Sequence, residues 1–177
     1  MTETATPPQQ LNRTALYPLQ KEQGAKFVDF HGWELPLQFS GILKEHEAVR
    51  NAAGLFDVSH MGQFIIEGSP AFAFLQRFMP TNLVKAKPGK AIYTNILNEK
   101  GGVVDDVIVY CLAQERYFMV VNASNVAKDL AWMRTFGISE GLMFEDGSNL
   151  YGMLALQGPK AAEIMKALLP EAEKLPF

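Results

Sequence analysis

The sequence predicts an α+β domain in which helices flank an antiparallel β-sheet. Three segments rich in β-branched and aromatic residues follow one another at 91–97, 103–111 and 117–122. The connections between them are so short that only antiparallel hairpins can join the strands. Segments with helical spacing of apolar residues lie before and after these strands. This order is typical of helices packed beside an antiparallel sheet.

The expected helices have recognisable ends. Gly54 is a stop after the first helix, and Ser69-Pro70 begins the second, because serine is a good N-cap and proline is tolerated in the first turn. Ser124 is the expected cap of the third helix. The predicted helices span 43–53, 69–80 and 125–136, with a last one opening at Gly158-Pro159.

Further strands and a leader complete the predicted order of elements. We expect one extended segment over 56–67 with its core at 64–66, and shorter strands at 142–144 and 151–157. Residues 1–12 are expected to form a disordered leader. They contain neither the apolar region of a secretory signal nor, in the first ten residues, the arginines of a mitochondrial presequence.

Composition limits the class of protein. The chain has 177 residues, 48% hydrophobic and 20% charged, which suits one soluble globular domain or a domain with a fragment of another. A net charge of −3 argues against a nucleic-acid partner. No apolar run approaches the ~18 residues of a membrane span. We therefore expect a soluble cytoplasmic protein, of bacterial type, with neither nucleic acid nor membrane as partner.

Two smaller features have simple interpretations. Cys111 is the only cysteine, so an internal disulfide and a cysteine-based metal site are excluded, and packing in a strand is its expected role. The basic residues Lys85, Lys87 and Lys90 form either a solvated loop, the favoured reading, or a docking patch for an acidic partner or an anionic ligand tail.

Two adjacent carboxylates, Asp105 and Asp106, interrupt the strand at 103–111. Successive side chains on a strand point to opposite faces, so one of the two acids must share the packed face. An acid in a half-apolar site is a candidate proton acceptor or ligand-ordering group.

Hairpin register singles out Asp106. If the first loop spans 98–101 and the second is centred on Gln114, Tyr93 and Asn122 lie opposite Asp106 on either side. Tyr110 and Val120 share that face. The alternatives are a carboxylate that ties down the hairpin, an N-cap role for Asn122 and packing roles for the tyrosines. Asp105 faces away and is expected to be solvated or salt-bridged.

Other catalytic patterns are weak or missing. Asp57, Ser59 and His60 are neighbours in an extended chain and do not converge as a triad. His31, His46 and His60 lack the spacing of metal ligands, so no metal is expected. The sequence has no glycine-rich phosphate loop, dinucleotide fingerprint or nucleophile elbow.

Several motifs resemble the aminomethyltransferases, the T proteins of the glycine cleavage system. The resemblance runs in order and spacing from about Leu16 to Lys166. The segments that carry it are Val28–Leu37 with His31-Gly32-Trp33, Glu45–Arg50, Gly54–Gly62, Lys90–Tyr93, Gly101–Asp106 and Ala155–Pro159.

The resemblance implies a folate-dependent one-carbon transfer. In this family an aminomethyl group on the lipoyl arm of the H protein is split, ammonia leaves, and tetrahydrofolate becomes 5,10-methylenetetrahydrofolate. The family's catalytic aspartate is the second of the Asp-Asp pair, here Asp106. The family's folate-lining positions correspond to Met61, Tyr93, Tyr110, Val120 and Asn122.

Family members continue well beyond residue 177. The resemblance thus implies that residues 13–177 are an incomplete, amino-terminal part of the folate-binding region, without the remaining folate-binding residues and the C-terminal barrel domain. We expect weak or no tetrahydrofolate binding and little activity from this chain alone.

Two alternatives share the folate-binding region. One is the folate domain of a dimethylglycine or sarcosine dehydrogenase, against which the His31-Gly32-Trp33 motif and the lack of a flavin-binding segment argue. The other is a non-catalytic folate-binding protein of iron-sulfur assembly. Its Lys-Gly-Cys-Tyr motif lies in a part that this chain does not reach.

Overall fold

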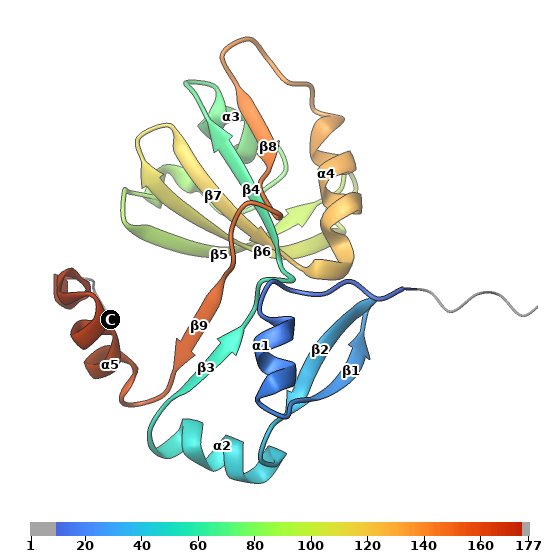
Figure 1. Cartoon of the computed structure of the whole chain (residues 1–177). Helices are drawn as coiled ribbons and strands as arrows, with labels where there is room; N and C mark the ends of the chain where they lie inside the picture. The colour runs from blue at the N-terminus through green and yellow to red at the C-terminus, as the bar shows by residue number, and fades with distance from the viewer. Residues whose placement is uncertain (1–9, 175–177) are drawn as a thin grey trace, which may run out of the picture. The chain divides into compact units, whose positions relative to one another are not determined.

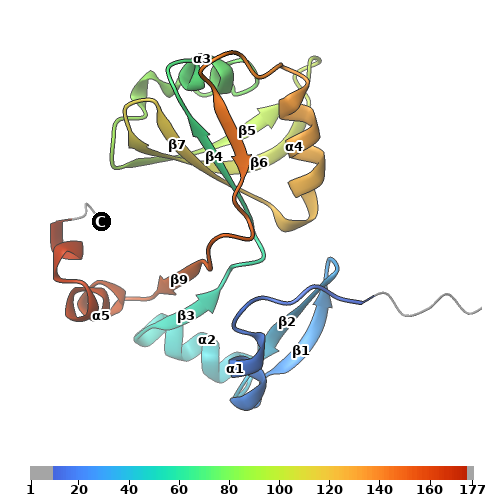
Figure 2. The ribbon, with the colours of Figure 1, turned by 45° about the horizontal axis from the view of Figure 1, so that its top comes forward.

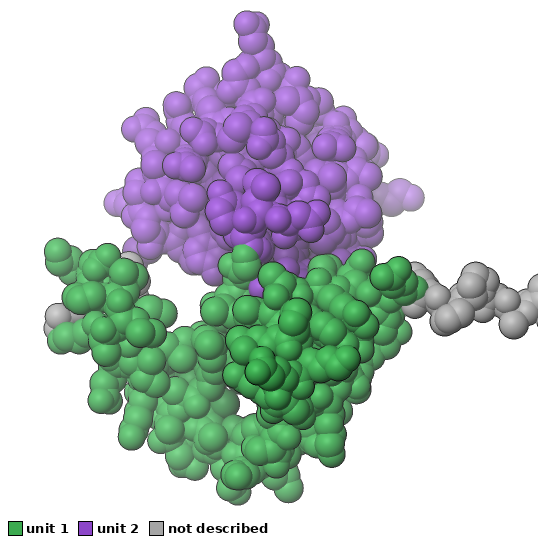
Figure 3. Space-filling model, in the orientation of Figure 1, with its two compact units in different colours: residues 1–58, 152–177 green, residues 59–151 purple. Residues whose placement is uncertain are grey.

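A computed structural model describes residues 10–174 (Figure 1). The chain forms two compact units, which Figure 3 colours separately: residues up to 58 with those from 152 onward, called unit 1, and residues 59–151, called unit 2. Every pair of strands in the sheets is antiparallel, so the predicted α+β class is confirmed. No helix within 10–174 is long and apolar enough to cross a membrane.

Unit 2 is built on a five-stranded sheet in the order β5-β6-β7-β4-β8 (Figures 1 and 2). The three successive strands predicted from the sequence are its β5, β6 and β7. The strands are β4 Gly62–Glu67, β5 Lys90–Leu97, β6 Val103–Ala113, β7 Arg116–Val121 and β8 Met143–Asp146.

One face of this sheet carries the core. Register places Phe64, Val109 and Met119 side by side on that face, and each is fully buried. Helices α3 Ala71–Gln76 and α4 Val126–Arg134 and the short 3₁₀ helix Leu83–Lys85 contribute further core residues. A second short 3₁₀ helix, Ala123–Asn125, precedes α4. Aromatic contacts complete the core, such as Phe74 with Phe144 at 5.5 Å between ring centroids. On the opposite face, Tyr93 of β5 is 69% exposed.

Unit 1 consists of two small antiparallel pairs and short helices. Its elements are α1 Tyr17–Glu22, β1 Lys26–Phe30, β2 Trp33–Gln38, α2 Ile42–Asn51, β3 Gly54–Asp57, β9 Leu154–Gln157, α5 Ala161–Leu168 and the 3₁₀ helix Pro170–Lys174. Strands β1 and β2 pair with each other, as do β3 and β9.

The sequence patterns did not reveal the β1-β2 hairpin, although its turn residues are informative. His31 and Gly32 both have positive φ angles, 51° and 83°. A two-residue hairpin turn needs this conformation because it matches the twist of the flanking strands. The carboxylate of Asp29 accepts a hydrogen bond from the Gly32 backbone N–H at 2.9 Å and stabilises the turn. The His31-Gly32-Trp33 motif is therefore a turn signal.

Gly158, in the motif before α5, is constrained by close backbone contacts. Its φ is 116°, and a Cβ there would lie 2.6 Å from the carbonyl oxygen of Ala52 and 2.7 Å from that of Val49. Any side chain would collide with the end of α2, so this junction requires glycine.

Several predicted boundaries were wrong. The single strand expected over 56–67 is two strands, since β3 pairs with β9 and β4 pairs with β7 and β8. Ser69 and Ser124 do not cap helices: α3 starts after Pro70 and α4 after Asn125, in both cases without a side-chain cap. The 151–157 strand begins only at Leu154, where its pairing with β3 begins opposite Asp57.

The expected leader overlaps the described residues only at its end. Residues 1–9 lie outside them, whereas Asn12 pairs with the β2 strand through backbone hydrogen bonds to Gly32 and Glu34. Among the predicted helices, α2, α4 and α5 agree with expectation to within a few residues.

Core packing gives a first prediction. Leu75 of α3 is fully buried. We expect Leu75→Ala to lower the free energy of unfolding by about 2–5 kcal/mol, because it removes buried methyl groups and leaves a cavity. Leu150→Ala is the matched control, since Leu150 is 66% exposed in the same unit, and it should change stability by no more than about 0.5 kcal/mol. Urea unfolding followed by circular dichroism measures both, and equal losses would contradict the assigned core.

Candidate functional site

Asp106 lies on the exposed face of the unit 2 sheet, between two polar side chains from the neighbouring strands. The hydroxyl of Tyr93 donates a hydrogen bond to Asp106 Oδ2 at 2.9 Å. From the other side, Asn122 Nδ2 lies 3.1 Å from the Asp106 backbone oxygen and 3.3 Å from Oδ1. The structure thus brings together the three residues of the predicted polar row.

The predicted pairing of Tyr93 was wrong by two residues. Tyr93 lies opposite Ile108, and Asn95 lies opposite Asp106. The connecting turn holds five residues, 98–102, one more than predicted, and the Asn98 side chain accepts hydrogen bonds from two backbone N–H groups in it. An irregularity in the pairing between Ile96 and Leu97 shifts the register by the second residue. A shift of two residues leaves every side chain on its face, so Tyr93 still reaches Asp106 along the diagonal.

The second hairpin has the predicted register. Ile108 pairs with Val120, and extending that ladder by two residues on each strand sets Asn122 opposite Asp106. Val120 is buried, and the ring of Tyr110 lies 6.1 Å from that of Phe118 on the same face. Met61 directly precedes β4 and is half-buried. In the pairing of β4 with β7, Gly62 lies opposite Val121, so Met61 falls beside Asn122.

The carboxylate of Asp106 affects the ionisation of Tyr93. The hydrogen bond to Asp106, followed by the charge of that carboxylate, raises the pKa of the Tyr93 phenol. Tyr93 therefore stays a hydrogen-bond donor in the neutral range. An exposed carboxylate held by two donors can accept a hydrogen bond or a proton from a ligand N–H at its remaining lone pairs.

The sequence prediction for Asp105 was wrong. It was expected to be solvated or salt-bridged, yet it is only 4% exposed. Its carboxylate accepts hydrogen bonds from the Asn122 backbone N–H at 3.1 Å, from Asn122 Nδ2 at 2.9 Å and from Asn125 Nδ2 at 2.6 Å. The physical reason is strand parity, because Asp105 shares the packed face with Val107 and Val109.

A second buried acid, Asp129 of α4, faces Asp105. Asp129 is fully buried and no donor group within 10–174 reaches its carboxyl oxygens, so a hydrogen bond with the neighbouring Asp105 carboxyl group requires a proton on one of the two acids. Burial, together with the hydrogen bond and negative charge of Asp105, raises the pKa of Asp129 to about 8. Burial alone would raise the pKa of Asp105 as well, but the hydrogen bonds from Asp129, Asn122 and Asn125 lower it. The raised pKa of Asp129 and the lowered pKa of Asp105 both favour Asp129 as the carrier of a proton shared by the pair.

Sequence reasoning missed Asn125 and Asp129, although a signal was present. The two residues are four apart at the start of a predicted helix, which puts them on one helix face. Parity already required an acid on the inner face of β6, and a buried acid needs polar partners. The helix packed on that face was the place to look for them.

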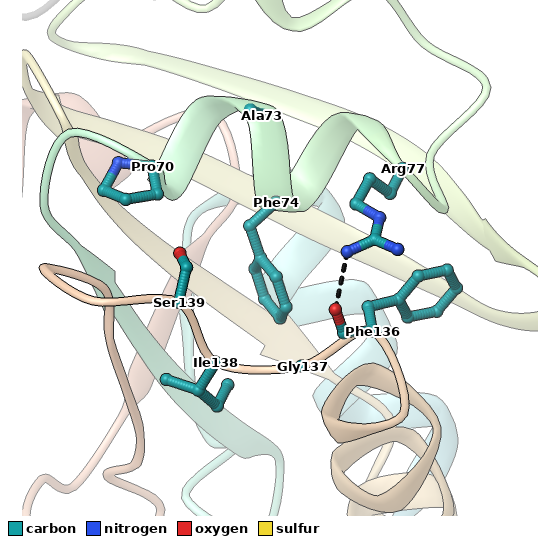
Figure 4. A pocket seen from close by; sticks show the side chains of 8 residues that line it. All are labelled: Pro70, Ala73, Phe74, Arg77, Phe136, Gly137, Ile138 and Ser139. Atoms are coloured by element: carbon teal, nitrogen blue, oxygen red, sulfur yellow. Dashed lines mark hydrogen bonds between the residues drawn. The ribbon is translucent and has the colours of Figure 1, made fainter.

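Two other features contain no residue of this row. Asp57 of unit 1 accepts hydrogen bonds from Thr14 at 2.6 Å and Gln20 at 2.8 Å, a structural cluster. Unit 2 contains a pocket of about 320 Å³, whose lining side chains are drawn in Figure 4. It is lined by Pro70, Ala73, Phe74, Arg77, Phe136, Gly137, Ile138 and Ser139, none of them a predicted site residue. Within 10–174 no three histidine, cysteine or acidic side chains are grouped as metal ligands.

The acid pair predicts a pH dependence of stability. Because the pKa of folded Asp129, about 8, exceeds its ordinary value, the folded state binds more protons than the unfolded state at intermediate pH. The stability that this proton contributes is complete below about pH 4 and is lost as pH rises through the folded pKa. Thermal melts from pH 5 to 9 should show the Tm of the wild type falling relative to that of Asp129→Asn. A difference in Tm that stays constant with pH would contradict the shared proton.

Comparison with known proteins places this geometry in context. The chain is 50% identical over 158 residues to an aminomethyltransferase of Bacillus subtilis, covering 89% of this chain and 43% of that protein. It is 46% identical over 163 residues to an aminomethyltransferase of Deinococcus deserti, covering 92% of this chain and 46% of the relative. The chain therefore spans less than half the length of these curated relatives.

A solved structure agrees with the fold. The glycine cleavage system aminomethyltransferase T from Bartonella henselae superposes with a TM-score of 0.84 at 37% sequence identity. The match covers 94% of this chain and 45% of that one. The family model described as the GCVT N-terminal domain matches residues 16–177. The chain thus belongs to the GCVT N-terminal domain family, that of the aminomethyltransferases.

Proposed function

We propose that this chain supplies the folate-facing carboxylate of a glycine-cleavage aminomethyltransferase. The reaction would release ammonia from the aminomethyl-lipoyl H protein and pass the one-carbon unit to tetrahydrofolate. The observation that carries the proposal is Asp106, exposed on the five-stranded sheet and held between the Tyr93 hydroxyl and the Asn122 amide. The similarity to aminomethyltransferases over most of the chain supports it.

The residues around Asp106 fit a reduced folate. Its pterin is a flat heterocycle with N–H donors and an amide-like edge. Tyr93 and Tyr110 offer partly exposed aromatic surface for it on the same sheet face. Asp106 offers acceptor oxygens, and Asn122, whose side-chain hydrogen bonds come from Nδ2, keeps Oδ1 as an acceptor. We propose Met61, Tyr93, Tyr110, Val120 and Asn122 as folate-lining residues.

The chemistry asked of Asp106 is limited and specific. When bound, tetrahydrofolate supplies the nitrogen that accepts the one-carbon unit. Asp106 would accept the hydrogen bond of that N–H and take up its proton as the new carbon–nitrogen bond forms. The carbon's bond to the amine nitrogen breaks in exchange, and the proton can pass to that nitrogen, which leaves as ammonia. Tyr93 and Asn122 fix the carboxylate from both sides, so it keeps one orientation during transfer. Positioned proton transfer of this kind contributes about 10²–10⁴-fold in rate.

Binding can be tested on this chain. We expect tetrahydrofolate, even when bound weakly, to shift the NMR signals of Tyr93, Tyr110 and Asn122 in a concentration-dependent way. Asp106→Asn should weaken those shifts, because the amide replaces one acceptor oxygen by a donor. Glu145→Gln is the matched control, since Glu145 is an exposed acid on β8, on the same sheet face. Shifts confined to other regions would refute the proposed site, and tight binding by calorimetry would refute the expectation of a weak, incomplete site.

Catalysis separates an enzyme from a folate-binding protein. We would replace the matching segment of an active aminomethyltransferase by residues 16–177 and measure 5,10-methylenetetrahydrofolate formation with the aminomethylated H protein. Asp106→Asn in that chimera should lower turnover by about 10²–10⁴-fold while folate still binds. Glu145→Gln should leave turnover unchanged. Normal turnover in the Asp106 variant would remove Asp106 from the mechanism.

A further inference from the structure

We propose that Asp129 is a positioning residue: with Asp105 it forms a buried acid pair that holds Asn122 in place, and through Asn122 the exposed carboxylate Asp106. The link to folate chemistry rests on the function proposed above. The positioning of Asn122 itself does not, because it is a property of this chain without any ligand.

The environment of Asp129 requires a proton. Its side chain is fully buried, and neither carboxyl oxygen receives a hydrogen bond from a donor group within 10–174. Its polar partner is the carboxyl group of Asp105. Two ionised carboxylates in contact inside a protein repel each other strongly, so a single proton shared between them is the stable arrangement. Protonated Asp129 then donates to Asp105, which remains the acceptor for the amides.

Asp105 transmits this arrangement to Asn122. The Asn122 side-chain amide has two hydrogens on Nδ2. One is directed at Asp105 Oδ1 at 2.9 Å, and the other is directed toward the Asp106 backbone oxygen at 3.1 Å and Oδ1 at 3.3 Å. Asp105 also accepts the Asn122 backbone N–H. Asp105 thus fixes the rotamer of Asn122 from the packed face of the sheet. On the exposed face, the same amide group contacts Asp106.

Loss of the Asp129 proton would disturb this chain of contacts. The charged groups that act on Asp129 are Asp105 from β6 and Lys128 from its own helix. Lys128 is committed to the carbonyl of Val104, which its Nζ approaches to 2.6 Å, so it does not neutralise the pair directly. A second negative charge beside Asp105 would draw the Asn122 and Asn125 amides into a new arrangement. The hydrogen bond to Asp106 should weaken at alkaline pH.

A titration without any substitution tests the pair. In protein carrying ¹³C-labelled aspartate, the carboxyl carbon of Asp129 should keep the shift of a protonated acid at pH 7, while that of Asp105 is ionised. The side-chain amide signals of Asn122 should then change together with the Asp129 signal as pH rises toward 9. Signals of Asn122 that stay constant while Asp129 ionises would overturn the proposal.

Two variants separate positioning from mere packing. Asp129→Asn keeps the volume and a donor toward Asp105, so the Asn122 signals should keep their neutral-pH position and lose the alkaline step. Asp129→Ala removes the donor and should shift the Asn122 signals at every pH. Glu145→Gln, which removes an exposed acid from the far strand of the same sheet, should leave both unchanged. An alkaline step that persists in Asp129→Asn would assign it to another group.

Folate binding gives an independent readout. In the chimera that carries residues 16–177 within an active aminomethyltransferase, the tetrahydrofolate dissociation constant should rise about tenfold between pH 7 and pH 9, equivalent to ~1.4 kcal/mol, whereas in its Asp129→Asn variant it should stay nearly constant. If folate does not bind at any pH but Asn122 still titrates with Asp129, the proposed function fails and the positioning role stands. If folate binds with the same pH dependence in both proteins, the positioning role fails and the proposed function stands.

Discussion

The alternation of side chains along β6 is the constraint on which the rest of the unit 2 site depends. Because neighbouring residues on a strand face opposite ways, Asp105 and Asp106 cannot lie on one surface. Helix α4 covers one face of the sheet, so Asp105 is buried and Asp106 is exposed. One strand thereby carries a structural acid and a chemically available acid at adjacent positions.

The buried acid determines what surrounds it. A carboxylate on the packed face is tolerated only if hydrogen bonds replace its water, and here Asn122 and Asn125 provide them at the turn between β7 and α4. The same requirement explains why this turn has no side-chain cap. Its two asparagines are committed to Asp105 instead of to the helix start, and Asp129 adds a third polar group to an otherwise apolar interface.

The sheet face of each site residue could be predicted from the alternation of odd and even positions along the strands. This prediction did not depend on the exact pairing register. The side of the sheet on which Tyr93, Asp106 and Asn122 lie follows from odd and even positions, and a two-residue error in the first hairpin left it unchanged. The starts of α3 and α4, expected at Ser69 and Ser124, and the separation of β3 from β4 at 58–61 were predicted poorly. Such boundaries depend on tertiary packing and not on local sequence alone. Asp129 was missed because its role depends on the packing of α4 against β6, which follows only when the parity of β6 is combined with the four-residue spacing of Asn125 and Asp129 on the helix.

Asn122 is where the two faces are coupled, and its chemistry explains why few other side chains could serve. Its amide offers two hydrogens from one nitrogen, so it can donate to an acid on each face of the same strand. Aspartate would offer no donor and would bring a further negative charge against Asp105 and Asp106. Glutamine would carry the amide one methylene farther from the backbone N–H that also binds Asp105. At the end of β7, the asparagine side chain has the length that lets one amide group contact both the buried Asp105 and the exposed Asp106.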